Sequence, residues 1–382
     1  MKNGKFIGTI IRMQYVPRWS EHAPRFEDNA ASHSFRCAAL SILAGIIEEK
    51  LFNRPINKLQ LTARCLWADL KNTGTGSIKY VTKNESLVME HIRGFEAVLS
   101  KEIVSYLSKS LQPVAADYIV NAQDDSPAGK LVDAIDLFDA FLYCHRETLY
   151  GTNPFFHAKY QELRLSLSKT GLPSIDWMLK EYEKQEGFYE FIHYIVNLDT
   201  VKRWNGSYNL VPDNDATHSF RTASLALFNG MLEKERFGNG GIDLYKLLAR
   251  AVLHDLPEAL SGDVVSKFKH NNPDIKRAFE LYEQETAQLM IGKLPAFFRE
   301  AMTDFIVNSK ADDYEGEMVD VADKLDALIK ASLEMRNNPH YADTYYNQLI
   351  KIQHRYEQPC VIFFLAYILH DLTYSSLIGQ QA

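Results

Sequence analysis

The sequence predicts an all-α protein built from two tandem copies of one helical domain, and three observations lead to this prediction. First, SHSFR at residues 32–36 recurs as THSFR at 217–221. Second, apolar residues follow helical spacing, for example over 219–232, 244–256 and 318–333. Third, we find no series of alternating, strand-like segments between the turn signals. Together these features predict two similar helical bundles.

Four matched segments in the same order indicate an internal duplication. Each segment lies 185 to 187 residues before its copy. One matching pentapeptide could arise by chance, but four pairs with nearly the same separation indicate a repeat. The stretch KEYEKQEG at 180–187 is polar and ends in glycine, as a linker does. We therefore expect domains at 1–185 and 186–382. Besides the pentapeptide, the matches are 7–19 with 192–204, 63–70 with 249–256, and 132–140 with 319–327.

Composition limits the classes of partner and the compartment. The 382 residues are 46% hydrophobic and 24% charged, with a formal net charge of −7, which argues against a nucleic-acid polymer as partner. The N-terminus lacks a signal-peptide pattern, and the apolar run at 361–369 is too short to span a bilayer. The four cysteines are scattered, without a C-x-x-C pair. These observations predict a cytoplasmic protein that does not bind membranes.

The second half contains four candidate metal ligands on three separate helical segments: His218, the adjacent pair His254 and Asp255, and Asp323. Two imidazoles and two carboxylates suit a divalent ion such as Mn²⁺, Co²⁺, Fe²⁺ or Zn²⁺. A helical bundle can direct such side chains to one interior point. Each residue alone would be an ordinary capped or salt-bridged group, and it is their order and spacing that favour a metal site.

Two acidic residues follow the His-Asp doublet. Glu258 comes four residues after His254, and on a continuous helix it would share its face. Pro257 disfavours a continuous helix there. Asp263 follows Gly262. Acids beside a metal are what a hydrolase needs, because one group takes a proton from water and another protonates the leaving oxygen.

The pattern H…HD…D, with HDLPEALSGD at 254–263, resembles the HD superfamily of metal-dependent phosphohydrolases. Together with the upstream Arg203-Trp204 pair, it resembles the bacterial 5′-deoxynucleotidases of the YfbR type. The resemblance implies two HD-domain bundles and removal of the 5′-phosphate from deoxyribonucleoside monophosphates. It also implies one divalent ion, with Co²⁺ or Mn²⁺ as usual activators. The implied ligands are His218, His254, Asp255 and Asp323.

The same resemblance assigns roles to other residues of the second half. It implies that Glu258 and Asp263 assist catalysis, and that Arg203 and Trp204 lie at the nucleotide pocket. Without the resemblance, Trp204 is better read as a core aromatic and Arg203 as the partner of a local acid. Lys269 is a candidate for contacting phosphate. We expect one bound ion. Co²⁺ or Mn²⁺ is the first expectation, and Fe²⁺, Zn²⁺ and Mg²⁺ are alternatives.

The first half is predicted to be non-catalytic. It keeps three ligand positions as His33, Asp69 and Asp136, but Ala68 stands where the second half has His254. Asn72 and Ser77 replace the two assisting acids. We expect the first half to pack as one member of an intramolecular pseudo-dimer, although Arg18-Trp19 leaves nucleotide binding open.

Two other functions compete with a 5′-nucleotidase. One is an HD phosphohydrolase acting on cyclic nucleotides, triphosphates or signalling nucleotides. The other is a non-catalytic nucleotide sensor, suggested by the degenerate first half. The sequence specifies neither the nucleotide, the native metal nor the oligomeric state. A second doublet, His370-Asp371, has no partner series and is predicted to be structural.

Overall fold

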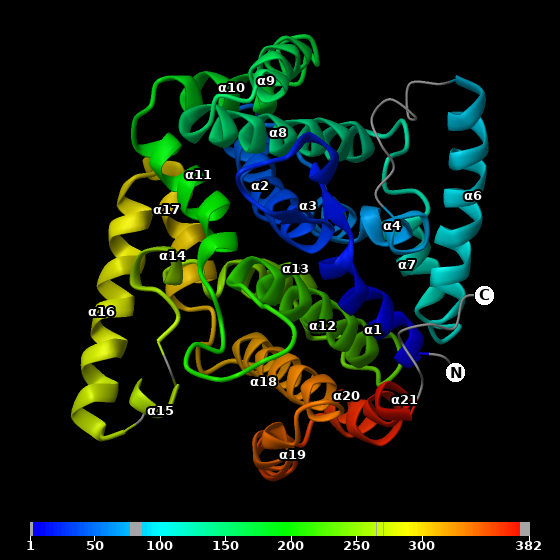
Figure 1. Ribbon diagram of the computed structural model, residues 1–382, viewed down its shortest axis with the longest axis vertical. Coiled ribbons are helices and arrows are strands. Elements are labelled where there is room, and N and C mark those ends of the chain that lie inside the picture. The colour runs from blue at the N-terminus through cyan, green and yellow to red at the C-terminus, as the bar shows by residue number, and fades with distance from the viewer. Residues whose placement is uncertain (1–2, 77–85, 265, 270, 375–382) are drawn as a thin grey trace. The chain divides into compact units, whose positions relative to one another are not determined.

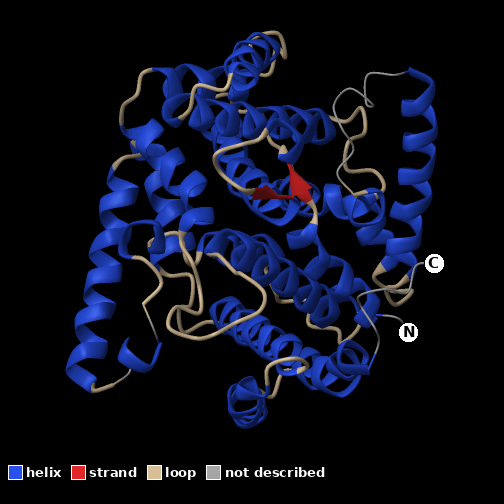
Figure 2. Ribbon diagram, viewed as in Figure 1, coloured by secondary structure: helices blue, strands red, loops and turns tan. Residues whose placement is uncertain are grey.

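The computed structural model describes residues 3–76, 86–264, 266–269 and 271–374, and these are mostly helical (Figures 1 and 2). The named strands among them are two antiparallel pieces of two residues each, β1 (Pro17–Arg18) and β2 (Asp28–Asn29). Pro17 pairs with Asn29, and Arg18 pairs with Asp28. The predicted all-α class is confirmed.

The chain divides into two compact units, which we call unit 1 (residues 1–177 and 363–382) and unit 2 (residues 178–362). Within unit 1, the C-terminal α21 (Leu369–Tyr374), which carries His370 and Asp371, packs on α1 (Asn3–Arg12). The domain boundary expected at residues 185 and 186 falls in the turn between α10 (Pro173–Glu183) and α11 (Gly187–Asn197), and it stays a prediction.

Unit 1 is built around α2 (Ala30–Lys50), which packs on α3 (Lys58–Trp67) and α8 (Pro127–Tyr150). The Asn29 side chain caps α2 by accepting a hydrogen bond from the backbone N–H of Ser32. The helix is apolar and long enough to cross a membrane by composition, but its apolar window is buried, as in a helix at the centre of a core. The other described helices are α4 (Asn72–Thr75), α6 (Ser86–Ser105), α7 (Gln112–Ile119) and α9 (Pro154–Leu167).

Unit 2 repeats this arrangement with α12 (Asp215–Glu235) at its centre, packed on α13 (Leu244–Leu253) and α18 (Tyr314–Met335) (Figure 1). Asn214 and Thr217 form a reciprocal capping box that begins α12. The other described helices are α14 (Glu258–Ser261), α15 (Ser266–Lys269), α16 (Pro273–Gly292), α17 (Ala296–Met302), α19 (Ala342–Arg355) and α20 (Pro359–Phe363).

One predicted helix ends earlier than expected. The apolar spacing indicated a helix over 244–256, but α13 ends at Leu253, and residues 254–257 form a turn. In this turn the His254 imidazole bonds the Ala251 carbonyl, at 2.8 Å. Pro257 then precedes the short α14, in keeping with its preference for the start of a helix. The turn places the His-Asp doublet at the end of a buried helix, facing α12 and α18.

Candidate metal centre

The four predicted ligands of unit 2 converge. His218 on α12 lies with its Nε2 3.3 Å from Asp255 Oδ2 and 3.3 Å from Asp323 Oδ1 on α18. The Nε2 of His254 lies 3.1 Å from the same oxygen of Asp255. Two ligand atoms held about 2.1 Å from one ion stand about 3 Å apart at a right angle. The spacing of these atoms therefore fits a single ion among them.

His254 provides the test of whether this site fits a cation. Its Nδ1 bonds the Ala251 carbonyl, which only accepts, so the ring proton sits on Nδ1 and Nε2 presents a lone pair. That Nε2 is buried and has no hydrogen-bond partner among the described residues, and it faces the carboxylate of Asp255. A lone pair buried against a carboxylate is costly without a positive charge between them. The residues therefore fit a divalent ion.

A buried network orients the other imidazole. His218 Nδ1 lies 2.7 Å from Asp326 Oδ2, and Asp326 receives a bond of 2.6 Å from Arg221 Nε. Arg221 also bonds Asp213 at 2.9 Å. A carboxylate behind a histidine fixes which ring nitrogen faces a metal. The network thus turns Nε2 of His218 toward Asp255 and Asp323.

Lysines compensate part of the negative charge of this centre. The Nζ atoms of Lys310 and Lys324 lie 2.7 and 3.1 Å from Asp323 Oδ2. Burial opposes ionisation of Asp323, but these two ammonium groups and His218 hold its pKa well below the usual range. Asp323 is therefore ionised, as a metal ligand must be.

The two predicted acids lie beside the ligands, together with an aspartate that the sequence analysis did not single out. Arg203 Nη1 is 2.9 Å from Asp215 Oδ1, 3.2 Å from Asp255 Oδ2 and 3.9 Å from Glu258 Oε2. Burial, followed by repulsion from Asp255 and Asp215, raises the pKa of Glu258 well above its ordinary value. Burial raises the pKa of Asp215 to about 6, and it also raises that of Asp263. Raised carboxyl pKa values are a feature of groups that exchange protons near neutral pH.

A cavity of about 810 Å³ opens at these residues, within the range of about 300–1,000 Å³ that is usual for small-molecule sites. Lys269 lines it and pairs with Glu283. Trp204 is not among its lining residues, and its ring instead lies 5.7 Å from that of Tyr341. Other predicted site residues on its wall are Arg203, His254, Asp255, Glu258, Asp263 and Asp323.

The sequence analysis did not single out Arg221 and Asp326, which orient His218, although the sequence contained a signal for both. Arg221 is the last residue of THSFR, and Asp326 lies in VDVADKLDA, so both fall in segments that matched the first half. Their counterparts Arg36 and Asp139 are identical. Identity between the two halves at these positions could have pointed to the network. Asp215 gave no such signal, because Ala30 stands in its place.

Comparison with known proteins decides the family. The model of the family described as "5′-deoxynucleotidase YfbR-like" matches twice, over residues 5–185 and 190–372. The chain belongs to the YfbR-like family. This result confirms the resemblance seen in the sequence, and the two matches agree with the internal duplication.

Two curated relatives each align with less than half of the chain. A 5′-deoxynucleotidase of Vibrio vulnificus is 25% identical over 150 residues, which are 39% of this chain and 77% of that protein. One of Shewanella oneidensis is 26% identical over 175 residues, 46% of this chain and 89% of that protein. A solved HD-domain phosphohydrolase of Listeria innocua is 23% identical, covers 50% of this chain and 91% of that one, and has a TM-score of 0.45.

The first family match, in unit 1, keeps the orienting network of the second. His33 Nδ1 lies 2.7 Å from Asp139 Oδ2, and Arg36 Nε lies 2.5 Å from Asp139 Oδ1. The Nε2 of His33 lies 2.8 Å from Asp136 and 3.4 Å from Asp69. Ala68 contributes no ligand, and Ser77 lies outside the described residues.

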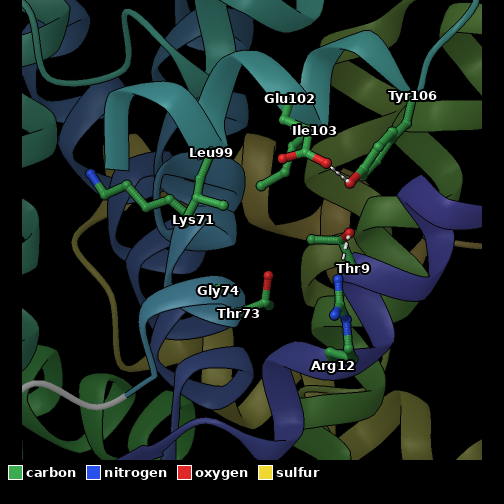
Figure 3. A pocket seen from close by; sticks show the side chains of 9 residues that line it. All are labelled: Thr9, Arg12, Lys71, Thr73, Gly74, Leu99, Glu102, Ile103 and Tyr106. Carbon is green, nitrogen blue, oxygen red and sulfur yellow. Dashed lines mark hydrogen bonds between the residues drawn. The ribbon is translucent and has the colours of Figure 1, made fainter. Parts of the chain in front are cut away.

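A pocket of unit 1 lies apart from this cluster. It is lined by residues of α1, α4 and α6 with their neighbours, among them Thr9, Arg12, Glu102 and Tyr106 (Figure 3). Arg12 donates a hydrogen bond to Thr9, and Tyr106 donates one to Glu102. Its volume of about 10 Å³ is close to the minimum of about 10–15 Å³ that one water needs. The pocket is therefore too small for a nucleotide.

Proposed function

We propose that unit 2 is a metal-dependent phosphomonoesterase that removes the 5′-phosphate from deoxyribonucleoside monophosphates. The observation that carries this proposal is the buried Nε2 of His254, which faces Asp255 without a hydrogen-bond donor among the described residues. The relatives named 5′-deoxynucleotidases support the substrate class.

The ion is held by His218, His254, Asp255 and Asp323 in this proposal, with Co²⁺ or Mn²⁺ as the expected metal. When bound, it supplies positive charge that polarises the phosphate and makes a nearby water more acidic. The chain itself fixes both imidazoles, through Asp326 behind His218 and the Ala251 carbonyl behind His254.

Glu258 and Asp263 handle protons. Both line the cavity beside Asp255, and both have raised pKa values that favour exchange near neutral pH. One carboxylate takes the proton of the attacking water, and the other group, while protonated, gives a proton to the leaving 5′-oxygen. The raised pKa of Glu258 makes it the better donor, which leaves the water to Asp263.

Positive side chains on the cavity wall receive the phosphate. Arg203 is held in place by Asp215, with its Nη1 bonded at 2.9 Å. Arg203 lines the cavity, and in this proposal its guanidinium binds a phosphate oxygen. Lys269 and Lys310 add positive charge to the same cavity. In this proposal Trp204, the residue after Arg203, shapes the sugar side of the site by fixing the backbone that carries Arg203.

Phosphate release from a panel of nucleotides tests this function. The full chain is stripped with chelator and reloaded with Co²⁺, Mn²⁺, Mg²⁺ or Zn²⁺ in turn. The panel pairs each deoxyribonucleoside monophosphate with its ribo counterpart and includes cyclic and triphosphate forms. We expect metal-dependent release from the deoxy monophosphates. Release from another class alone would overturn the substrate, and tight nucleotide binding without turnover under any metal would favour a sensor.

A further inference from the structure

The two carboxylate oxygens of Asp323 have different partners. Oδ1 lies 3.3 Å from Nε2 of His218. Oδ2 accepts hydrogen bonds from the Nζ atoms of Lys310, at 2.7 Å, and Lys324, at 3.1 Å. Hydrogen bonds between an ammonium group and a carboxylate are about twice as strong as bonds between neutral groups. Two such bonds to one oxygen hold the carboxylate in place and leave Oδ1 for an ion.

Lys310 reaches Asp323 from outside α18. It follows the π-helical turn η5 (Thr303–Val307) and precedes the start of the helix. It lines the cavity together with Val307 and Asn308. Single π-helical turns occur frequently at functional sites. The side chain of Lys310 is 35% exposed, so we expect that it can be replaced without a large loss of packing.

Unit 1 has neither lysine at the equivalent positions. The capping residues that begin α8 and α18 lie 187 residues apart, which is the offset of the repeat in this region. At that offset Gln123 stands at the position of Lys310, and Leu137 stands at that of Lys324. Gln123 instead accepts a hydrogen bond from Lys71, at 3.2 Å. The loss of both lysines is thus a second difference between the units, besides the loss of an imidazole.

The equivalent aspartate of unit 1 lies closer to its histidine. Asp136 Oδ1 is 2.8 Å from Nε2 of His33, whereas the same two atoms of Asp323 and His218 are 3.3 Å apart. The shorter distance is that of a direct hydrogen bond. Two ligand atoms, each about 2.1 Å from one ion, stand about 3.0–3.4 Å apart at right-angled or tetrahedral geometry. The pair in unit 2 therefore has the spacing of two ligands, and the pair in unit 1 does not.

We propose that Lys310, together with Lys324, is a positioning residue of the metal centre. It holds Asp323 away from His218, so that the carboxylate presents one oxygen to the ion and does not close on the imidazole. This role rests on the proposed function, because it takes Asp323 as a ligand. It also explains the geometry of unit 1, where a glutamine and a leucine replace the lysines and the aspartate meets the imidazole directly.

Calorimetric titration of the metal-free full chain with Mn²⁺ or Co²⁺ alone tests this role without turnover. The wild-type chain is expected to bind an ion that Asp323→Asn loses. Lys310→Met is expected to weaken binding of that ion by about 10–100-fold, the usual effect of removing a group that hydrogen-bonds a ligand. Lys310→Arg can donate to the same oxygen and is expected to restore most of the affinity.

Lys246→Met is the matched control. Lys246 is 30% exposed, belongs to unit 2 and pairs with Asp313 at 2.8 Å, so its loss removes a similar ion pair away from the ligands. We expect it to keep the wild-type affinity. Equal or tighter binding by Lys310→Met would show that the lysine does not position Asp323, because removal of a positive charge alone favours a cation. That result would overturn the proposal.

A double variant copies unit 1 and tests the geometry itself. In the metal-free crystal structure of Lys310→Gln with Lys324→Leu, Asp323 Oδ1 is expected to approach Nε2 of His218 to hydrogen-bond distance, as Asp136 approaches His33 at 2.8 Å. An unchanged separation of 3.3 Å would contradict the proposed role.

Phosphate release, assayed on the same samples, separates this proposal from the function of unit 2. Wild-type affinity and wild-type release in Lys310→Met would overturn the positioning role alone. The expected series of affinities without release from any nucleotide would overturn the proposed function and support the positioning role. A wild-type chain that binds neither Mn²⁺ nor Co²⁺ would overturn both.

Discussion

The clusters of unit 1 and unit 2 share the same outer network but differ in the residues that we propose for metal binding and catalysis. The network keeps its residue types pair by pair, as His33, Asp139, Arg36 and Asp28 in one unit and His218, Asp326, Arg221 and Asp213 in the other. The inner positions differ: Ala68 for His254, Asn72 for Glu258 and Ala30 for Asp215. The difference teaches that this buried ion network does not depend on the proposed catalytic acids, because it persists where their counterparts are absent.

The backbone before the network is also shared. Trp19 and Trp204 both have φ of 60°, a left-handed conformation that is strained for a bulky residue. In unit 1 the ring of Trp19 stacks on Tyr143 at 5.5 Å, so there it serves packing. The strained turn persists in unit 1, which lacks counterparts of the proposed catalytic acids. Its presence therefore does not by itself indicate a substrate site.

The largest effect on turnover is expected when His254 of unit 2 is replaced by alanine, the residue at the equivalent position of unit 1. His254→Ala removes the ligand whose lone pair faces Asp255, and turnover is expected to fall to the metal-free background. The reverse change, Ala68→His, is the matched control and leaves turnover unchanged, because unit 1 still lacks the acids. Both are measured as phosphate release from the preferred monophosphate. Normal turnover in His254→Ala would show that this histidine does not account for the difference between the two units.

Neutralising the acid comes next. Glu258→Gln is expected to lower kcat by about 10²–10⁴-fold, the usual contribution of a general acid or base. The metal content stays at the wild-type level, because Glu258 is not among the proposed ligands. Asn72→Ala, at the equivalent position of unit 1, serves as control and has no effect on kcat. A Glu258→Gln variant with wild-type kcat would remove this residue from the proton transfers.

The orienting network predicts a split between stability and activity. Asp326→Asn and Asp139→Asn each remove a charge from a buried pair and are expected to lower the free energy of unfolding by about 3–5 kcal/mol. Asp326→Asn also lowers metal affinity or turnover by about 10–100-fold. Asp139→Asn leaves the turnover of the folded protein near the wild-type rate. Equal loss of turnover in both variants would mean that the two units act together in catalysis.

The smallest effect concerns pH. The charge of Asp215 contributes to the raised pKa of Glu258, after burial and Asp255. Asp215→Asn removes that negative charge, so the pKa of Glu258 falls, and the limb of the kcat profile that depends on Glu258 moves to lower pH. Asp274→Asn, an exposed residue at the start of α16, leaves the profile unchanged. A shift to higher pH in Asp215→Asn would contradict the assigned electrostatics.

The sequence predicted the fold class, and it singled out ligand candidates that converge in the structure, because both depend on local spacing. Apolar residues at helical intervals indicated α12 and α18, and the HD doublet pointed to its partners. Pro257 indicated a break in the helix, but it did not specify that α13 ends as early as Leu253. The hydrogen bonds from Arg203 to Asp215 and Asp255 join residues up to 52 positions apart in the sequence, so they are seen only in the folded structure. The metal, the pseudo-dimer and the cytoplasmic location stay predictions.

The most direct test of the account replaces the equivalent histidines of the two units. His218→Ala and His33→Ala are each stripped of metal, reloaded with Co²⁺ or Mn²⁺, checked for helical content by circular dichroism, and assayed for phosphate release from deoxyribonucleoside monophosphates. The account predicts no metal-dependent release from folded His218→Ala and release near the wild-type rate from folded His33→Ala. The opposite pattern, or loss of release in both folded variants, would contradict the assignment of the chemistry to unit 2.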